Sequence, residues 1–118
     1  MAKKRVLIVD DSPFSIMMVK GYVEAEHPDW SVLEASNAIE AIELCDEKNI
    51  HYMTIDYNMP GMDGLTLIQQ LRNSHPRAKM ALLTGNINPD IQKKALELGA
   101  EFIQKPITLA KIATYLKN

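Results

Sequence analysis

The feature that most constrains this sequence is a regular alternation of short apolar runs with segments of helical periodicity. The first and fourth of the five runs show no alternation with polar residues, which is typical of parallel strands covered on both faces. The alternation therefore predicts an α/β fold, a doubly wound parallel sheet of five strands connected by five helices. The runs are Val6-Leu7-Ile8-Val9, Ser31-Val32-Leu33, Met53-Thr54-Ile55, Met80-Ala81-Leu82-Leu83 and Phe102-Ile103.

The helices between these runs are predicted by signals at their ends. Each begins at a residue whose side-chain oxygen can accept a hydrogen bond from the first turn, and two have proline at the first helical position. The expected starts are Ser12-Pro13, Ser36 or Asn37, Asp63, Asn88-Pro89 and Thr108, and Gly99 is the expected stop of the fourth helix. The side chains expected to face the sheet are Ile16, Val19, Val23, Ala38, Ala41, Ile42, Cys45, Leu67, Ile68, Leu71, Ile91, Ala95, Leu98, Leu109, Ile112 and Leu116.

Length and composition predict one globular domain over residues 1–118, since 47% of the residues are hydrophobic and 24% are charged. The net charge of −2 gives no indication of nucleic acid or of an anionic membrane as a partner. The basic cluster Lys3-Lys4-Arg5 is interpreted as a solvated strand entrance rather than a nucleic-acid arm. No apolar run approaches the roughly 18 residues that span a bilayer, and no signal peptide is present, so the cytoplasm is the default location.

Acidic residues follow two of the predicted strands. Asp10 and Asp11 come directly after the first run, and Asp56 ends the third. In doubly wound sheets, ligands bind beyond the carboxyl ends of the strands, so these side chains should converge. Crowded carboxylates repel one another unless a hard cation neutralises them, and Mg²⁺ prefers oxygen ligands. The sequence therefore predicts a Mg²⁺ site at this edge.

A hydroxyl and an ammonium group are expected at the same edge. Thr84 ends the fourth run, and Lys105 follows the fifth, where the carboxylates should offset its desolvation. These groups are suited to binding a phosphoryl group, and Gly85 permits close approach of the backbone. Together with the carboxylates, they indicate a metal-assisted site that accepts a phosphoryl group.

Each of these residues also has a simpler structural explanation. An aspartate pair before Ser12-Pro13 suits a strand-to-helix turn, and Asp56 could open the turn at Pro60-Gly61. A β-branched residue such as Thr84 is common at the end of a strand. The functional interpretation therefore rests on the convergence of the whole set at one edge.

The remaining distinctive residues are expected to be structural. Cys45 is the only cysteine, so it is interpreted as a buried small hydrophobe rather than a reactive thiol. Trp30 is expected to pack at the rim of the sheet. The histidines His27, His51 and His75 are expected at the surface on the amino side of the strands, and the methionines Met17, Met18, Met53 and Met80 are expected to fill the core.

With these motifs in place, the chain resembles the receiver domain of bacterial two-component response regulators, the family of the chemotaxis regulator. The resemblance implies a flavodoxin-like (βα)5 fold with strand order 2-1-3-4-5 and identifies Asp56 as the phosphoacceptor. It implies that Asp11, Asp56 and the main-chain carbonyl of Asn58 bind Mg²⁺, while Asp10 acts mostly through water.

The same resemblance assigns the remaining positions. Thr84 is the switch hydroxyl, Phe102 the switch aromatic and Lys105 the lysine that pairs with phosphate, with the Lys105-Pro106 bond expected in cis. Asn58 and Asn86 occupy positions that vary in the family and tune dephosphorylation.

The implied function is signalling rather than turnover of a substrate. A sensor histidine kinase or a histidine phosphotransfer protein would supply the phosphoryl group, docking on the first helix and the loop after the fifth strand. Phosphorylation and autodephosphorylation of Asp56 would be self-catalysed. The fourth helix, fifth strand and fifth helix would then bind a downstream effector, through a surface that includes Gln92, Lys93, Lys94, Gln104 and Lys111.

Two other functions agree less well with the sequence. A Mg²⁺-dependent phosphohydrolase of the haloacid dehalogenase type needs a second aspartate two residues after its nucleophile, but Ser12 follows Asp10 and Asp11. A phosphorylation-independent interaction module usually lacks acidic or lysine positions that are present here. The pathway, the oligomeric state and whether the domain is stand-alone or part of a longer regulator stay open.

Overall fold

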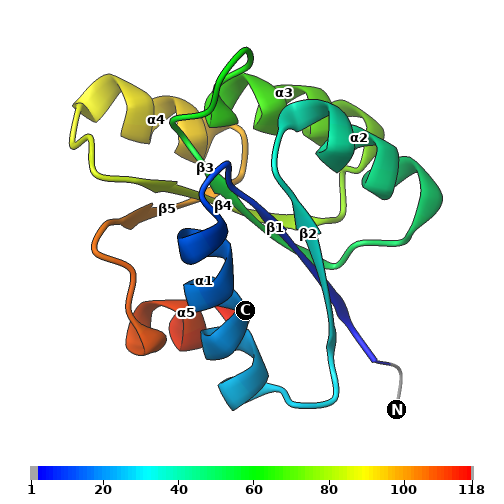
Figure 1. Cartoon of the computed structure of the whole chain (residues 1–118). Coiled ribbons are helices and arrows are strands. Elements are labelled where there is room, and N and C mark those ends of the chain that lie inside the picture. Colours follow the sequence, from blue (N-terminus) through cyan, green and yellow to red (C-terminus); the bar gives the residue numbers. More distant parts are fainter. Residues whose placement is uncertain (1–2, 118) are drawn as a thin grey trace.

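The computed structural model describes residues 3–117, so residues 1, 2 and 118 of the expected domain lie outside the described part (Figure 1). Five parallel strands form one sheet in the order β2-β1-β3-β4-β5, which confirms the predicted fold class and strand order. The strands are β1 Arg5–Val9, β2 Ser31–Ala35, β3 Tyr52–Asp56, β4 Lys79–Thr84 and β5 Glu101–Gln104. The helices are α1 Pro13–Glu26, α2 Ala38–Glu47, α3 Gly64–Ser74, α4 Pro89–Glu97 and α5 Leu109–Leu116.

The helices cover both faces of the sheet. Helices α1 and α5 lie on one face, and α2, α3 and α4 lie on the other, as Figure 1 shows. Because the chain leaves β1 on one side and β3 on the other, the two neighbouring strands are followed by loops that diverge and leave a crevice at their carboxyl ends. This crevice is where the predicted site lies.

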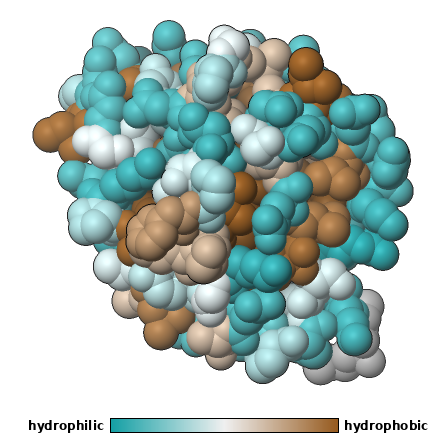
Figure 2. All heavy atoms as spheres, viewed as in Figure 1, coloured by the Kyte–Doolittle hydropathy of each residue, from teal (hydrophilic) through white to brown (hydrophobic). Residues whose placement is uncertain are grey.

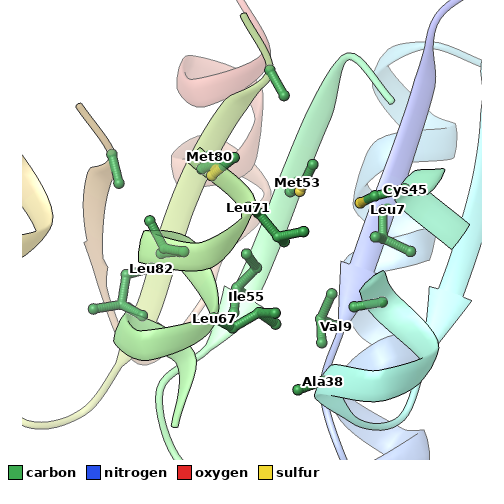
Figure 3. Close-up of a cluster of buried hydrophobic side chains, with 14 of the residues drawn as sticks. Leu7, Val9, Ala38, Cys45, Met53, Ile55, Leu67, Leu71, Met80 and Leu82 are labelled. Atoms are coloured by element: carbon green, nitrogen blue, oxygen red, sulfur yellow. The ribbon is translucent and has the colours of Figure 1, made fainter. Parts of the chain in front are cut away.

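The larger core layer lies between the sheet and helices α2, α3 and α4. In Figure 3, the strand residues Met53 and Ile55 face Leu67 and Leu71 of α3. Cys45 on α2 is buried in the same layer, and burial raises the pKa of its thiol to about 11. A thiol with so high a pKa is protonated at neutral pH, in agreement with its interpretation as a structural residue.

The opposite layer contains a buried polar contact between α5 and the central strand. The hydroxyl of Tyr115 donates a hydrogen bond of 2.8 Å to the main-chain oxygen of Met53, and burial raises the pKa of the phenol. Tyr115 also meets Tyr52 edge-on, with ring centroids 5.7 Å apart. These contacts fix α5, and with it the loop that carries Lys105, against the sheet.

The predicted helix starts are confirmed by side-chain hydrogen bonds to first-turn N–H groups. The second helix is capped by Asn37 rather than Ser36, and Glu40 instead accepts hydrogen bonds from the Ser36 backbone and hydroxyl. Gly99 follows the end of α4 with φ of 74°, a conformation that favours glycine. The capping residues are Ser12, Asn37, Asp63, Asn88 and Thr108.

Two predicted core residues are exposed. Met17 is 68% exposed because it adjoins Ile16 in the α1 stripe and so points away from the sheet. Leu109 is 42% exposed because it begins α5, whose buried side chains start only at Ile112. The expectation that these two side chains lie in the core was therefore wrong.

The three histidines lie on the amino side of the strands, as expected, where they are half-buried and make specific contacts. His27 stacks on Trp30 with ring centroids 3.6 Å apart, and Trp30 stacks on Tyr52 at 5.4 Å. His51 accepts a hydrogen bond at Nδ1 from the backbone N–H of Arg5.

Among the described residues, no helix is long and apolar enough to cross a membrane.

Candidate functional site

Three carboxylates converge where β1 and β3 end. Asp10 and Asp11 follow β1, Asp56 ends β3, and one oxygen of each lies within 4.8 Å of the others. Asp10 and Asp56 are buried, whereas Asp11 is exposed. Residues far apart in the chain are thus brought to one point by the pairing of β1 with β3.

The crowding affects the protonation of Asp10. Burial raises the pKa of Asp10 above its usual range, and the Asp56 and Asp11 carboxylates add to the rise. The N–H of Ser12, which donates a 2.9 Å hydrogen bond to Asp10 Oδ1, and the Lys105 ammonium oppose it. The net effect is a raised pKa, so Asp10 holds a proton more readily than a solvent-exposed aspartate does.

Asp56 is paired with the predicted lysine. Nζ of Lys105 lies 2.6 Å from Oδ1 of Asp56, whose side chain is only 4% exposed. The two groups are not aligned for a hydrogen bond, so this buried oxygen has an electrostatic partner but no directional one. Lys105 itself is 36% exposed, so its predicted desolvation is only partial.

Hydrogen bonds hold the backbone on both sides of Lys105. Its N–H donates to the Thr84 oxygen at 2.9 Å, and the Lys105-Pro106 bond is cis, as predicted. The ammonium of Lys111 donates to the oxygens of Gln104 and Pro106, at 2.8 and 2.9 Å. Lys111 therefore bridges the residues flanking Lys105, a contact that the sequence did not reveal.

Thr84 is buried at the end of β4, and its hydroxyl accepts a 2.9 Å hydrogen bond from the backbone N–H of Asn86. Phe102 of β5 lies opposite Leu82 of β4, and Gln104 of β5 lies opposite Thr84 of β4. Because side chains alternate along a strand, Thr84, Leu82 and Phe102 share the face covered by α4. Phe102 is half-buried beside that core layer. Thr84 and Phe102, the predicted switch pair, therefore lie on the same face of the sheet, on neighbouring strands and two residues apart in the strand register.

The loop between Asp56 and the start of α3 is tight. Gly61 has φ of 83°, and the N–H of Gly64 donates to the Tyr57 oxygen at 2.9 Å. Asn58 in this loop is exposed, and its role as a main-chain metal ligand stays a prediction. Asp63 accepts a hydrogen bond from Thr66 N–H at 2.8 Å, so it caps α3, as expected.

The donor set fits Mg²⁺. Three carboxylates offer oxygens within 4.8 Å of one another, and hard oxygen ligands are those that Mg²⁺ takes in proteins. Asp56 Oδ1 has no hydrogen-bond donor among the described residues, and the pKa of Asp10 is raised in the protein alone. A divalent cation would add positive charge beside these oxygens, giving Asp56 Oδ1 a ligand and opposing the rise in the pKa of Asp10.

Comparison with known families gives an assignment that agrees with this geometry. The model of the response regulator receiver domain matches residues 6–117. The chain belongs to this family. The predicted resemblance is therefore confirmed over residues 6–117.

The receiver domain is similar to proteins of different lengths. It is 33% identical over 116 residues to the chemotaxis protein CheY of Listeria monocytogenes, covering 97% of this chain and 96% of CheY. It is 32% identical over 116 residues to the cyclic di-GMP phosphodiesterase response regulator RpfG of Xanthomonas campestris, covering 96% of this chain but only 31% of RpfG. A CheY-like receiver domain from Methanospirillum hungatei superposes with a TM-score of 0.90 at 26% identity, covering 98% of this chain and 92% of that one.

Gly64 provides a test of how closely the α3 start is packed against Asp56. A Cβ at this position would overlap the Asp56 carbonyl oxygen and lie 3.0 Å from Leu82 Cδ1. Since backbone atoms cannot move aside, Gly64→Ala is expected to lower the free energy of unfolding by about 1–3 kcal/mol, measured by urea denaturation.

Gly21→Ala is the matched control, because Gly21 lies inside α1 with nothing within 4 Å of an added Cβ. It should raise the free energy of unfolding by about 0.5–1 kcal/mol. Equal stability of the Gly64→Ala variant and the wild type would contradict the close approach to Asp56.

Proposed function

We propose that this chain is a single receiver domain over residues 1–118, located in the cytoplasm, that accepts a phosphoryl group on Asp56. The donor is a phosphohistidine of a sensor histidine kinase or of a histidine phosphotransfer protein. The observation that carries the proposal is a buried carboxylate beside two others, with a lysine ammonium 2.6 Å away. Family membership supports the signalling role.

In the proposed reaction, an oxygen of Asp56 attacks phosphorus as the bond to the imidazole nitrogen breaks. The electron pair of that bond leaves with the imidazole. Asp10, Asp11, Asp56 and the Asn58 carbonyl would hold Mg²⁺, which when bound supplies positive charge to the oxygens of the transferring group. Lys105 would pair with the phosphoryl oxygens, since its ammonium already lies against Asp56.

Phosphorylation would act on the switch pair by adding a charge of about −1.5 to −2 next to Thr84. The Thr84 hydroxyl accepts a hydrogen bond from Asn86 N–H in this structure and would move to donate its own O–H to a phosphoryl oxygen. Phe102 lies on the same face and turns into the space that Thr84 leaves. This is a bistable element biased by one local charge.

Two surfaces suit the expected partners. Figure 2 shows hydrophobic surface where α1 lies, and Phe14 and Met17 on this helix are 72% and 68% exposed. This surface is proposed to dock the phosphodonor next to Asp56. The output surface on α4, β5 and α5 has a groove of about 390 Å³ between β5 and α5, and its exposed residues include Gln92, Lys93, Lys94, Gln104 and Lys111.

Replacement of the acceptor tests the proposed function. Wild-type protein treated with acetyl phosphate and Mg²⁺ should gain one phosphoryl group by mass spectrometry, and Asp56→Asn should gain none because the amide is not a nucleophile. Asp46→Asn, which alters an exposed carboxylate on α2, should label like the wild type. Normal labelling of the Asp56→Asn variant would contradict the assignment of Asp56 as the phosphoacceptor.

Phe102→Ala tests the switch separately from the chemistry. Labelling of Asp56 by acetyl phosphate should persist, while phosphorylation should shift fewer amide resonances in α4, β5 and α5, because no ring moves to transmit the change. Phe14→Ala, which removes an exposed ring on α1, should retain the wild-type pattern. An unchanged spread of resonance shifts in Phe102→Ala would show that the aromatic ring is not part of the switch.

A further inference from the structure

The end of the sheet opposite Asp56 carries a cavity that the proposed function does not use. It has a volume of about 830 Å³ and is lined by the segments that precede β1, β3 and β4, together with the end of α5. The volume lies in the range of sites that take small molecules, about 300–1,000 Å³. The size of the cavity therefore suits a small-molecule ligand.

The lining is basic without any acidic residue. It contains Lys4, Arg77, Lys79 and Lys117, together with His51 and His75, and no aspartate or glutamate. Over the whole chain, acidic residues outnumber lysine and arginine by 15 to 13. The positive charge of this cavity is therefore a local arrangement and does not reflect the composition of the protein.

Two of the cations approach the same aromatic ring. The ammonium groups of Lys4 and Lys79 lie 5.6 and 5.9 Å from the ring centroid of Tyr52, from segments before β1 and at the start of β4. Within residues 3–117, the four cations of the lining make no ion pair with a carboxylate. Like charges gathered without a carboxylate partner among the described residues favour binding of an anion.

His51 is fixed by the backbone of two strands. Its N–H donates to the Arg5 oxygen at 3.0 Å, and its own oxygen accepts from Lys79 N–H at 2.9 Å. Its ring accepts from Arg5 N–H at Nδ1, so neutral His51 carries its proton on Nε2 and offers a donor there. The cavity wall at this position is therefore held in place before any ligand arrives, which lowers the entropic cost of binding.

His75 provides a second imidazole in the lining. Its Nε2 is buried without a hydrogen-bond partner among the described residues and lies 3.8 Å from Asp46 Oδ1, beyond hydrogen-bond distance. Asp46 on α2 is exposed and is not part of the lining. Because this nitrogen is buried and lies beside Asp46, anion binding in the cavity does not depend on a hydrogen bond from His75 to a ligand.

We propose that this cavity is a binding site for a small anion that carries several phosphate groups. Lysine and arginine are the side chains that bind phosphate, and four of them around one cavity match a polyvalent anion better than a single carboxylate. The cavity lies at the amino ends of β3 and β4, whereas Asp56 and Thr84 lie at their carboxyl ends. The two sites are therefore separate.

Titration with sodium tripolyphosphate tests the proposal. The Asp56→Asn variant is used without divalent cations, so that the acidic site cannot contribute. Trp30 is the only tryptophan and stacks on Tyr52, which lines the cavity, so its fluorescence reports on binding and calorimetry gives the affinity. Saturable binding is expected, and a double Lys4→Gln, Lys79→Gln variant should weaken it by roughly tenfold or more.

The matched control is a double Lys93→Gln, Lys94→Gln variant, which removes two exposed cations from α4 and should leave the affinity unchanged. Tighter binding of ATP than of tripolyphosphate would identify a nucleotide as the source of the phosphates, and equal binding would identify the phosphate chain itself. A response matched by NaCl at equal ionic strength, or equal weakening in the control variant, would overturn the proposal. Tighter binding of a single-stranded oligonucleotide would also overturn it, in favour of a nucleic-acid surface.

Discussion

Repulsion among three carboxylates is the constraint on which the rest of this structure depends. Asp10, Asp11 and Asp56 are held with oxygens within 4.8 Å of one another, and two of the three are buried. Lys105 offsets part of this charge through its contact with Asp56, and the N–H of Ser12 offsets another part at Asp10. Folding therefore creates a site with excess negative charge. A bound cation would reduce this excess, and a transferred phosphoryl group would increase it.

The fold provides the rigidity that holds these groups together. Asp10 follows β1 and Asp56 ends the neighbouring strand β3, and the N–H of Lys105 donates to the main-chain oxygen of Thr84 at the end of β4. The start of α3 packs directly on the Asp56 backbone at Gly64. Because each group is fixed by a separate strand or cap, a charge change at Asp56 acts on neighbours that cannot all relax, which favours discrete movement of a side chain such as Phe102.

Sequence predicted the features that depend on local chemistry. The apolar runs gave the strands, and Ser12, Asp63 and Thr108 gave helix starts, because a cap or a strand is encoded within a few residues. Features set by distant segments were missed. The bridge from Lys111 to the loop around Lys105 was not visible, nor was the convergence of cations from the chain before β1, the loop before β4 and the end of α5 at one cavity. Leu109 was misplaced because periodicity does not show where a helix extends past the sheet.

The free energy of unfolding of an Asp10→Asn variant, in chelator and in Mg²⁺, tests the central claim most directly. The amide keeps an acceptor for Ser12 N–H but removes one of the crowded charges. In chelator the variant should be at least as stable as the wild type, and Mg²⁺ should stabilise the wild type more than the variant. Asp63→Asn, at a cap outside the cluster, should leave the Mg²⁺ effect unchanged. A wild type that gains no stability from Mg²⁺, or a variant that loses stability in chelator, would contradict the account.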